Sequence, residues 1–161
     1  MDIKKALLGL LESDCRTTPK QAAVMLGLGE EEVREAVASL EREGVILGYK
    51  AVVDWDKTDR EMVSALIELK VSPQKNRGFD QIAEMICAFP EVQAVYLVSG
   101  GYDIAVMLEE RTMREVAYFV SEKLAAMNNI VSTATHFVLK KYKEKNVIYD
   151  SSEPDTRSNV V

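Results

Sequence analysis

The sequence has little of the chemistry that most enzymes and metalloproteins need. It contains one histidine, His136, and two cysteines, Cys15 and Cys87, among 161 residues. The cysteines lie far apart and neither belongs to a CxxC motif, so we interpret both as structural thiols. The sequence shows no nucleophile–base pair, metal-binding cluster or phosphate-binding loop. These absences argue against an enzyme and against a bound metal or cofactor.

Long apolar runs and a strong charge of one sign are also missing. No stretch approaches the roughly 18 residues that a membrane-spanning helix needs. The N-terminal "MDIKKALLGLLESD" is interrupted by glycine and acidic residues, so we expect an amphipathic helix and a cytoplasmic protein. The net charge is −6, and residues 1–54 carry seven basic and ten acidic side chains. Charge alone therefore marks no segment as a strong nucleic-acid binder.

The first fifty residues predict three helices and a strand. Hydrophobic residues make up 47% of the chain, enough for a real core. Thr18 suits the N-cap of a short second helix, and Pro19 suits its first position. A third helix is expected over residues 30–43, with Gly44 ending it. The β-rich stretch 45–54 then predicts a strand. This order is typical of a winged helix-turn-helix.

The second half of the chain predicts the element order βαββαβ. Its strands are rich in β-branched and apolar residues, and its helices repeat apolar residues at helical spacing. The order is that of a ferredoxin-like fold, with both helices on one face of a four-stranded antiparallel sheet. We expect strands over 62–71, 92–98, 102–108 and 130–142, and helices over 79–89 and 112–127.

These elements predict an α+β protein with two domains. The strands 92–98 and 102–108 are apolar on both faces, so a second copy of the chain is expected to cover the open side of the sheet. The expected segments are a DNA-binding domain (1–53), a linker (54–61), a ferredoxin-like domain (62–145), and an edge strand with a disordered tail (146–161).

Several motifs resemble the Lrp/AsnC family, also called feast/famine regulators. The resemblance rests on "SDCRTTPKQAAVMLGL", "VASLEREGVILGYKAVVD", "VSGGYDIAV" and "IVSTATHFVLK", and covers residues 1 to about 145. It implies a transcription regulator that dimerises through its C-terminal sheets. It also implies that many members form octamers and bind an amino acid or similar small molecule between dimers. Two features depart from the family: its third helix is usually basic, and its turn often has an aspartate where this chain has Gly101.

The third helix carries an unusual charge for DNA recognition. Residues 29–44, "GEEEVREAVASLEREG", hold six glutamates and two arginines. On a helical wheel Val33, Val37 and Leu40 form the buried side, and the opposite side presents glutamates and, at its far end, Arg42. Glutamate there can accept a hydrogen bond from a cytosine amino group, although the helix dipole also favours acids in any first turn. The candidate DNA contacts are Arg16, Lys20, Glu31, Arg34, Glu35, Ala38, Ser39, Arg42 and Lys50.

The sequence "SGGYD" supports two interpretations. Two glycines between apolar strands are typical of a two-residue hairpin turn. Alternatively, their uncovered amides could bind a ligand carboxylate, while Asp103 takes an ammonium group and Tyr102 forms a wall. The resemblance adds two hydroxyl groups on the last strand. The candidate effector-binding residues are Gly100, Gly101, Tyr102, Asp103, Thr133 and Thr135.

Three functions follow from these patterns. The first is a regulator that binds double-stranded DNA and responds to an amino acid or related molecule. The second keeps the fold but has an acidic third helix that no longer binds DNA, leaving an effector-binding or assembly protein. The third is an enzyme, because sirohaem decarboxylases share this architecture. Those enzymes rely on histidines, and this chain has only His136, so we expect no enzymatic activity.

Overall fold

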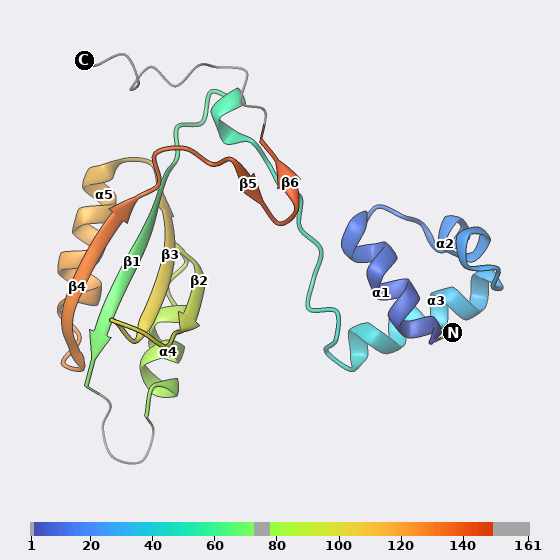
Figure 1. Ribbon diagram of the computed structural model, residues 1–161, viewed down its shortest axis with the longest axis horizontal. Helices are drawn as coiled ribbons and strands as arrows, with labels where there is room; N and C mark the ends of the chain where they lie inside the picture. Colours follow the sequence, from blue (N-terminus) through green and yellow to red (C-terminus); the bar gives the residue numbers. More distant parts are fainter. Residues whose placement is uncertain (1, 73–77, 150–161) are drawn as a thin grey trace. The chain divides into compact units, whose positions relative to one another are not determined.

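The computed structural model describes residues 2–72 and 78–149, which form two compact units with a boundary after Val52 (Figure 1). The expected disordered tail from residue 150 lies outside the described residues. The first unit holds three helices, and the second holds the sheet with its helices. None of the described helices is long and apolar enough to cross a membrane.

The first unit is a helix-turn-helix built on three helices: α1 (Ile3–Ser13), α2 (Pro19–Leu26) and α3 (Glu30–Arg42). The expected start of α2 is confirmed, because Thr18 and Gln21 form a reciprocal capping box and Pro19 opens the helix. Gly27 adopts a left-handed conformation with φ 68° and ends α2. The core of this unit contains Leu7, Ala22, Ala23, Val33 and Leu40.

Gly44 ends α3 as expected. Its φ is 68°, and its amide donates to the Glu41 carbonyl while the Val45 amide donates to the Leu40 carbonyl. This pair of hydrogen bonds is a Schellman motif, which satisfies the last carbonyls of the helix.

The expected strand over residues 45–54 does not form, so the wing is absent from the first unit. A strand needs a neighbour for its backbone amides and carbonyls, and no described segment of the chain pairs with this one. Ile46 packs against the core of the first unit, but two of its apolar neighbours remain in solvent: Leu47 is 92% exposed and Val45 is 51% exposed. A β-rich composition favours a strand, but it does not supply the second strand with which it must pair.

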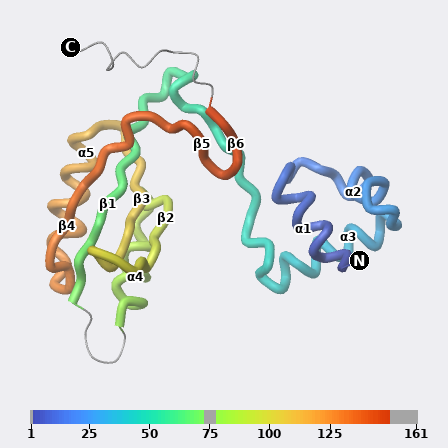
Figure 2. Tube along the Cα trace, viewed as in Figure 1, coloured from blue at the N-terminus to red at the C-terminus, as the bar shows by residue number. Residues whose placement is uncertain are grey.

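The second unit confirms the expected ferredoxin-like fold. Its sheet has the order β2-β3-β1-β4, with all neighbours antiparallel (Figure 2). The strands and helices are η1 (Trp55–Lys57), β1 (Val63–Val71), α4 (Asp80–Cys87), β2 (Val92–Leu97), β3 (Ile104–Glu110), α5 (Met113–Tyr118), η2 (Phe119–Leu124) and β4 (Ile130–Phe137). The segment η2 is a π-helix that continues α5, where we had expected one uninterrupted α-helix.

Both helices of this unit pack on one face of the sheet. Alternate residues of β1, including Ile67 and Leu69, are fully buried there against Ile82 and Ile86 of α4 and Val116 of α5. The β3 residues that pair with this β1 set are buried in the same core. The inward face of β1 therefore follows the alternation of residues along the strand.

No described helix of the sheet domain packs on the opposite face of the sheet, although η1 and residues 138–141 line a cleft with the buried Ser64 at one end of that face. Register places Leu66 of β1 beside Met107 of β3, and Met107 beside Ala94 of β2. Tyr96 pairs with Ala105 on the same face, and the Tyr96 side chain is 57% exposed. We call this set the open face. These five residues are apolar or aromatic, whereas on the β4 side of the same face Nε2 of His136 lies 3.4 Å from Oε1 of Glu68. Exposed apolar side chains gathered on one face favour a partner surface.

We expected an edge strand of the main sheet to begin at residue 146, but residues 146–149 do not form one. Instead β5 (Lys143–Glu144) and β6 (Val147–Ile148) pair with each other in a separate hairpin. Lys145 and Asn146 have φ values of 45° and 67°. Two consecutive positive φ angles match the type I′ turn, whose twist suits a two-residue hairpin. The turn at these two residues therefore favours the pairing of β6 with β5 over its pairing with the main sheet.

Candidate DNA-binding and effector-binding sites

The solvent side of α3 is the candidate DNA-reading surface. Val33 and Leu40 are buried on its inner side, while Glu31, Glu35 and Arg42 are exposed on the opposite side. Ala38 lies between the last two and is half-buried. The wheel prediction is correct for these residues, because a regular helix carries its 3.6-residue period into space.

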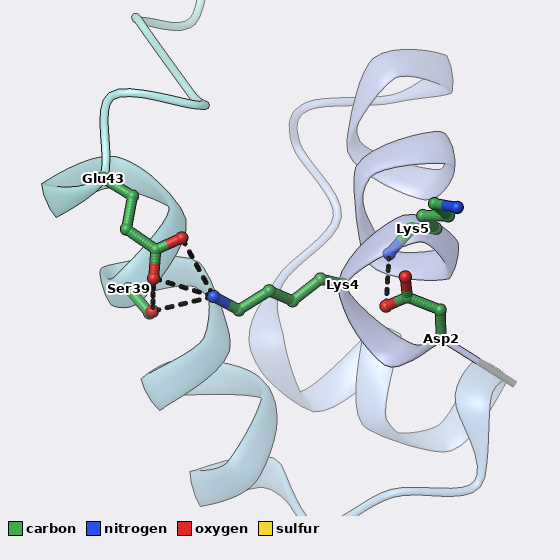
Figure 3. A network of polar contacts seen from close by, with 5 residues as sticks. All are labelled: Asp2, Lys4, Lys5, Ser39 and Glu43. Carbon is green, nitrogen blue, oxygen red and sulfur yellow. Dashed lines mark hydrogen bonds and ion pairs between the residues drawn. The ribbon is translucent and has the colours of Figure 1, made fainter.

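Ser39 does not lie free on that surface. Its hydroxyl donates to Oε1 of Glu43 at 2.6 Å, and Nζ of Lys4 donates to the same hydroxyl at 3.2 Å (Figure 3). Lys4 also donates to both carboxylate oxygens of Glu43, at 2.8 and 3.0 Å. The hydrogen bonds from Lys4 and Ser39 lower the pKa of Glu43. This network ties α1 to the C-terminal end of α3 and occupies Ser39.

Two of the expected phosphate-binding arginines are already paired with acids. Arg16 donates through two nitrogens to Asp14, both at 3.0 Å, and this hydrogen bonding lowers the pKa of Asp14. Arg34 donates to Glu30 at 2.6 Å and lies 3.6 Å from Glu31. Such exposed pairs are weak, so a phosphate can compete with the acid for each guanidinium group. The neighbouring carboxylates nevertheless reduce the net positive charge that either arginine presents to DNA.

Three other basic residues of the candidate set have no hydrogen bond or salt bridge to an acid among the residues that the structure describes, although the charge of Arg42 helps to lower the pKa of Glu43. All three are exposed, so a phosphate can approach them. Lys20 is the second residue of α2, Arg42 is the last residue of α3, and Lys50 follows the Schellman turn. The positive part of the surface therefore lies at the start of α2 and beyond the C-terminal half of α3.

The candidate effector turn is longer than the two-residue hairpin that the glycines suggested. β2 ends at Leu97 and β3 begins at Ile104. The Val98 amide donates to the Asp103 carbonyl at 2.9 Å, which closes a four-residue loop. Gly100 adopts φ 154°, a conformation open to glycine, and a side chain at Gly100 or Gly101 would meet open space. The loop is therefore exposed and uncrowded, as a ligand contact requires.

Asp103 has a structural role that the sequence did not suggest. Its carboxylate Oδ2 accepts from the Val71 amide at 2.9 Å, and its own amide donates to the Leu69 carbonyl at 2.9 Å. The Val71 amide points to the same side of β1 as the Leu69 carbonyl, toward β3, and the pairing of β1 with β3 ends at Leu69 and Ile104, so this amide is left for Asp103. The carboxylate thus anchors the turn to β1 through Oδ2, and within the described residues its Oδ1 accepts no hydrogen bond.

Thr133 and Thr135 are not on the same surface as the loop glycines. They pair with Leu69 and Ile67, so their side chains point to the helix-covered face of the sheet, where both are half-buried. Gly100, Gly101 and the half-buried Tyr102 belong to the exposed loop. The structure therefore brings Tyr102 and Asp103 together with the glycines and leaves the two threonines deeper in the fold.

The second unit also has a small cleft that no sequence motif indicates. It has a volume of about 110 Å³ and lies between the η1 segment and the chain that leaves β4. On its wall Lys141 donates to Glu109 at 2.9 Å, and the buried Ser64 donates to the same carboxylate oxygen at 3.1 Å. Burial is the largest single influence on the pKa of Lys141 and would lower it, but the hydrogen bond to Glu109 and the charges of Glu109 and Glu144 together outweigh burial and raise that pKa. These contacts fasten the end of β4 to β3.

A helix-turn-helix unit joined to a ferredoxin-like unit with an uncovered sheet face defines a class of two-part regulators. The profile of the Lrp/AsnC ligand binding domain matches residues 64–148, more than half of the chain. The chain belongs to the Lrp/AsnC family.

Related sequences and structures agree with this assignment. The uncharacterised HTH-type transcriptional regulator YugG of Bacillus subtilis is 42% identical over 152 residues, which cover 94% of this chain and 92% of YugG. The leucine response regulatory protein LrpA of Mycobacterium tuberculosis has a TM-score of 0.75 at 22% identity, with 90% of this chain and 96% of LrpA covered. A Neisseria meningitidis regulator, NMB0573, solved in complex with L-Met, has a TM-score of 0.73 at 19% identity and 98% coverage of both chains.

Proposed function

We propose that this protein is a sequence-specific DNA-binding transcriptional regulator that responds to an amino acid. The observation that carries the proposal is the helix-turn-helix with an exposed outer face of α3, joined to a domain of the Lrp/AsnC ligand-binding type. YugG, which is named as an uncharacterised HTH-type transcriptional regulator, is similar over nearly the whole chain.

The effector part of the proposal concerns the exposed loop before β3. The amides of Gly100 and Gly101 would bind a carboxylate, and the free oxygen of Asp103 would accept from the ammonium group. Tyr102 would contact the ligand side chain. Thr133 and Thr135 lie on β4 and would act indirectly, through the neighbouring strand β1, to which Asp103 anchors the loop. The L-Met complex of the Neisseria relative supports an amino acid as the ligand class.

The protein is also proposed to form a dimer through its open face. Leu66, Ala94 and Met107 would otherwise leave a contiguous apolar surface in water. A dimer presents two helix-turn-helix units to one DNA duplex and doubles every phosphate contact. The doubling compensates for the acidic groups that accompany Arg16 and Arg34.

Lys20→Ala and Arg42→Ala are each expected to weaken DNA binding and to reduce its salt dependence. Each removes one unpaired positive charge near phosphate, so the slope of log affinity against log salt should fall by about one per contacted phosphate. Gel-shift titrations of a selected genomic fragment at several salt concentrations measure both effects. Lys57→Ala, in the second unit, is the charge-matched control and should leave binding unchanged.

A failure to select any genomic fragment would contradict the DNA-binding proposal. The selection should be run with purified protein in the presence and absence of amino acids. Lack of binding under every condition would favour the alternative of an effector-binding protein whose α3 no longer reads DNA. The neutralised Arg16 and Arg34 are the specific observation in favour of that alternative.

A further inference from the structure

One glutamate of α3 has no partner that explains its presence. Glu30 and Glu31 contact Arg34, Glu41 accepts from the Tyr49 hydroxyl at 3.0 Å, and Glu43 binds Lys4. Glu35 is exposed and has no hydrogen bond or ion pair within the described part of the chain. Glu32, the remaining glutamate, lies in the first turn, where the helix dipole favours an acid.

Helix stability does not account for Glu35. It is the sixth residue of α3, beyond the first turn in which the helix dipole favours acids. Its neighbours at i−4 and i−3 are Glu31 and Glu32, which carry the same charge, and its i+4 neighbour is Ser39. Like charges at this spacing destabilise a helix slightly. The residue is therefore unfavourable for the fold of an isolated chain.

The position of Glu35 is favourable for reading DNA. It lies almost opposite the buried Val33 and shares the solvent side of α3 with Ala38 and Arg42. At about 1.5 Å rise per residue, Glu35 and Arg42 are roughly 10 Å apart along the helix axis, which is about three base-pair steps in a duplex. The small Ala38 between them leaves room for both to approach base edges.

A carboxylate in the major groove requires a specific donor. Phosphates on both strands repel it, and of the base edges the exposed amino group of cytosine is the one that glutamate characteristically accepts from. We propose that Glu35 is a specificity-determining residue that selects a cytosine in each half-site. The inference rests on the proposed DNA binding and adds the base that this residue recognises.

The test is selection of bound duplexes from a random library, followed by sequencing, with the wild type and Glu35→Gln. Glutamine keeps the length of the side chain but prefers the N6 and N7 edge of adenine. We expect one position per half-site to change from cytosine to adenine, with a change in relative affinity of about 5- to 150-fold. Glu35→Ala should lose preference at that position and bind non-specific DNA more tightly.

Glu32→Gln is the matched control because it removes the same charge from the same helix. It should raise affinity for all sequences to a similar extent and leave the selected bases unchanged. Melting temperatures within a few degrees of the wild type confirm that the fold is intact, because loss of the dipole interaction at Glu32 or of like-charge repulsion at Glu35 changes the stability by at most about 1 kcal/mol. A wild-type consensus that Glu35→Gln leaves unaltered overturns the role of Glu35 alone. If the wild type selects no sequence, the proposed function itself fails, and the role of Glu35 with it.

Discussion

Met107→Glu is expected to convert the protein from a dimer to a monomer of 18.0 kDa. Met107 lies on β3, an inner strand of the sheet, and pairs with Leu66 on one side and Ala94 on the other. A glutamate there would stand in water in the monomer but would be buried without a partner in the dimer. The twofold symmetry would repeat this cost in both subunits. Light scattering at micromolar concentration measures the change in mass.

Met113→Glu provides the control for the dimer prediction. Met113 is 55% exposed at the start of α5, on the helical side of the second unit, so the added charge should stay in solvent and leave the dimer intact. If the wild type itself has a monomer mass, the open face is not a dimer interface. If Met107→Glu stays dimeric while the wild type is a dimer, the chains associate through another surface.

Local patterns were sufficient to predict most of the fold. The alternation along β1, the caps at Thr18 and Gly44, and the helical spacing in α3 depend on residues close in sequence, and the structure has each of them. The strand over 45–54 was wrong because pairing is not local: β-rich composition cannot show whether a second strand is available. The prediction that residues 147–148 belong to an edge strand of the main sheet was wrong because the turn at Lys145 and Asn146 pairs them with β5.

In the candidate sites, too, only contacts between residues close in sequence could be predicted. The Arg34–Glu30 pair has the spacing of an i,i+4 ion pair, so its formation could have been expected from the sequence. The Lys4–Glu43 contact joins residues 39 positions apart, and no local rule predicts it. The Val71–Asp103 hydrogen bond joins residues 32 positions apart, at the point where the pairing of β1 with β3 ends. The sequence therefore shows the charge of Asp103 but not its contact with β1.

Asp103→Asn and Asp103→Ala are expected to separate the two roles of this residue. The asparagine side-chain oxygen can still accept from the Val71 amide, so the fold should keep nearly wild-type stability. Alanine leaves that amide, on a residue that is 7% exposed, without its acceptor. An unsatisfied buried amide costs about 1–3 kcal/mol, which should lower the melting temperature by several degrees.

Both variants remove the negative charge that an ammonium group would contact. A thermal-shift screen of the twenty amino acids should identify one that raises the melting temperature of the wild type, because a ligand that binds only the folded state stabilises it. We expect Asp103→Asn to lose most of that shift while its ligand-free melting temperature stays near the wild type. A full shift in Asp103→Asn would place the ammonium group elsewhere. If millimolar amino acids produce no shift in the wild type, the loop is only a connection between β2 and β3.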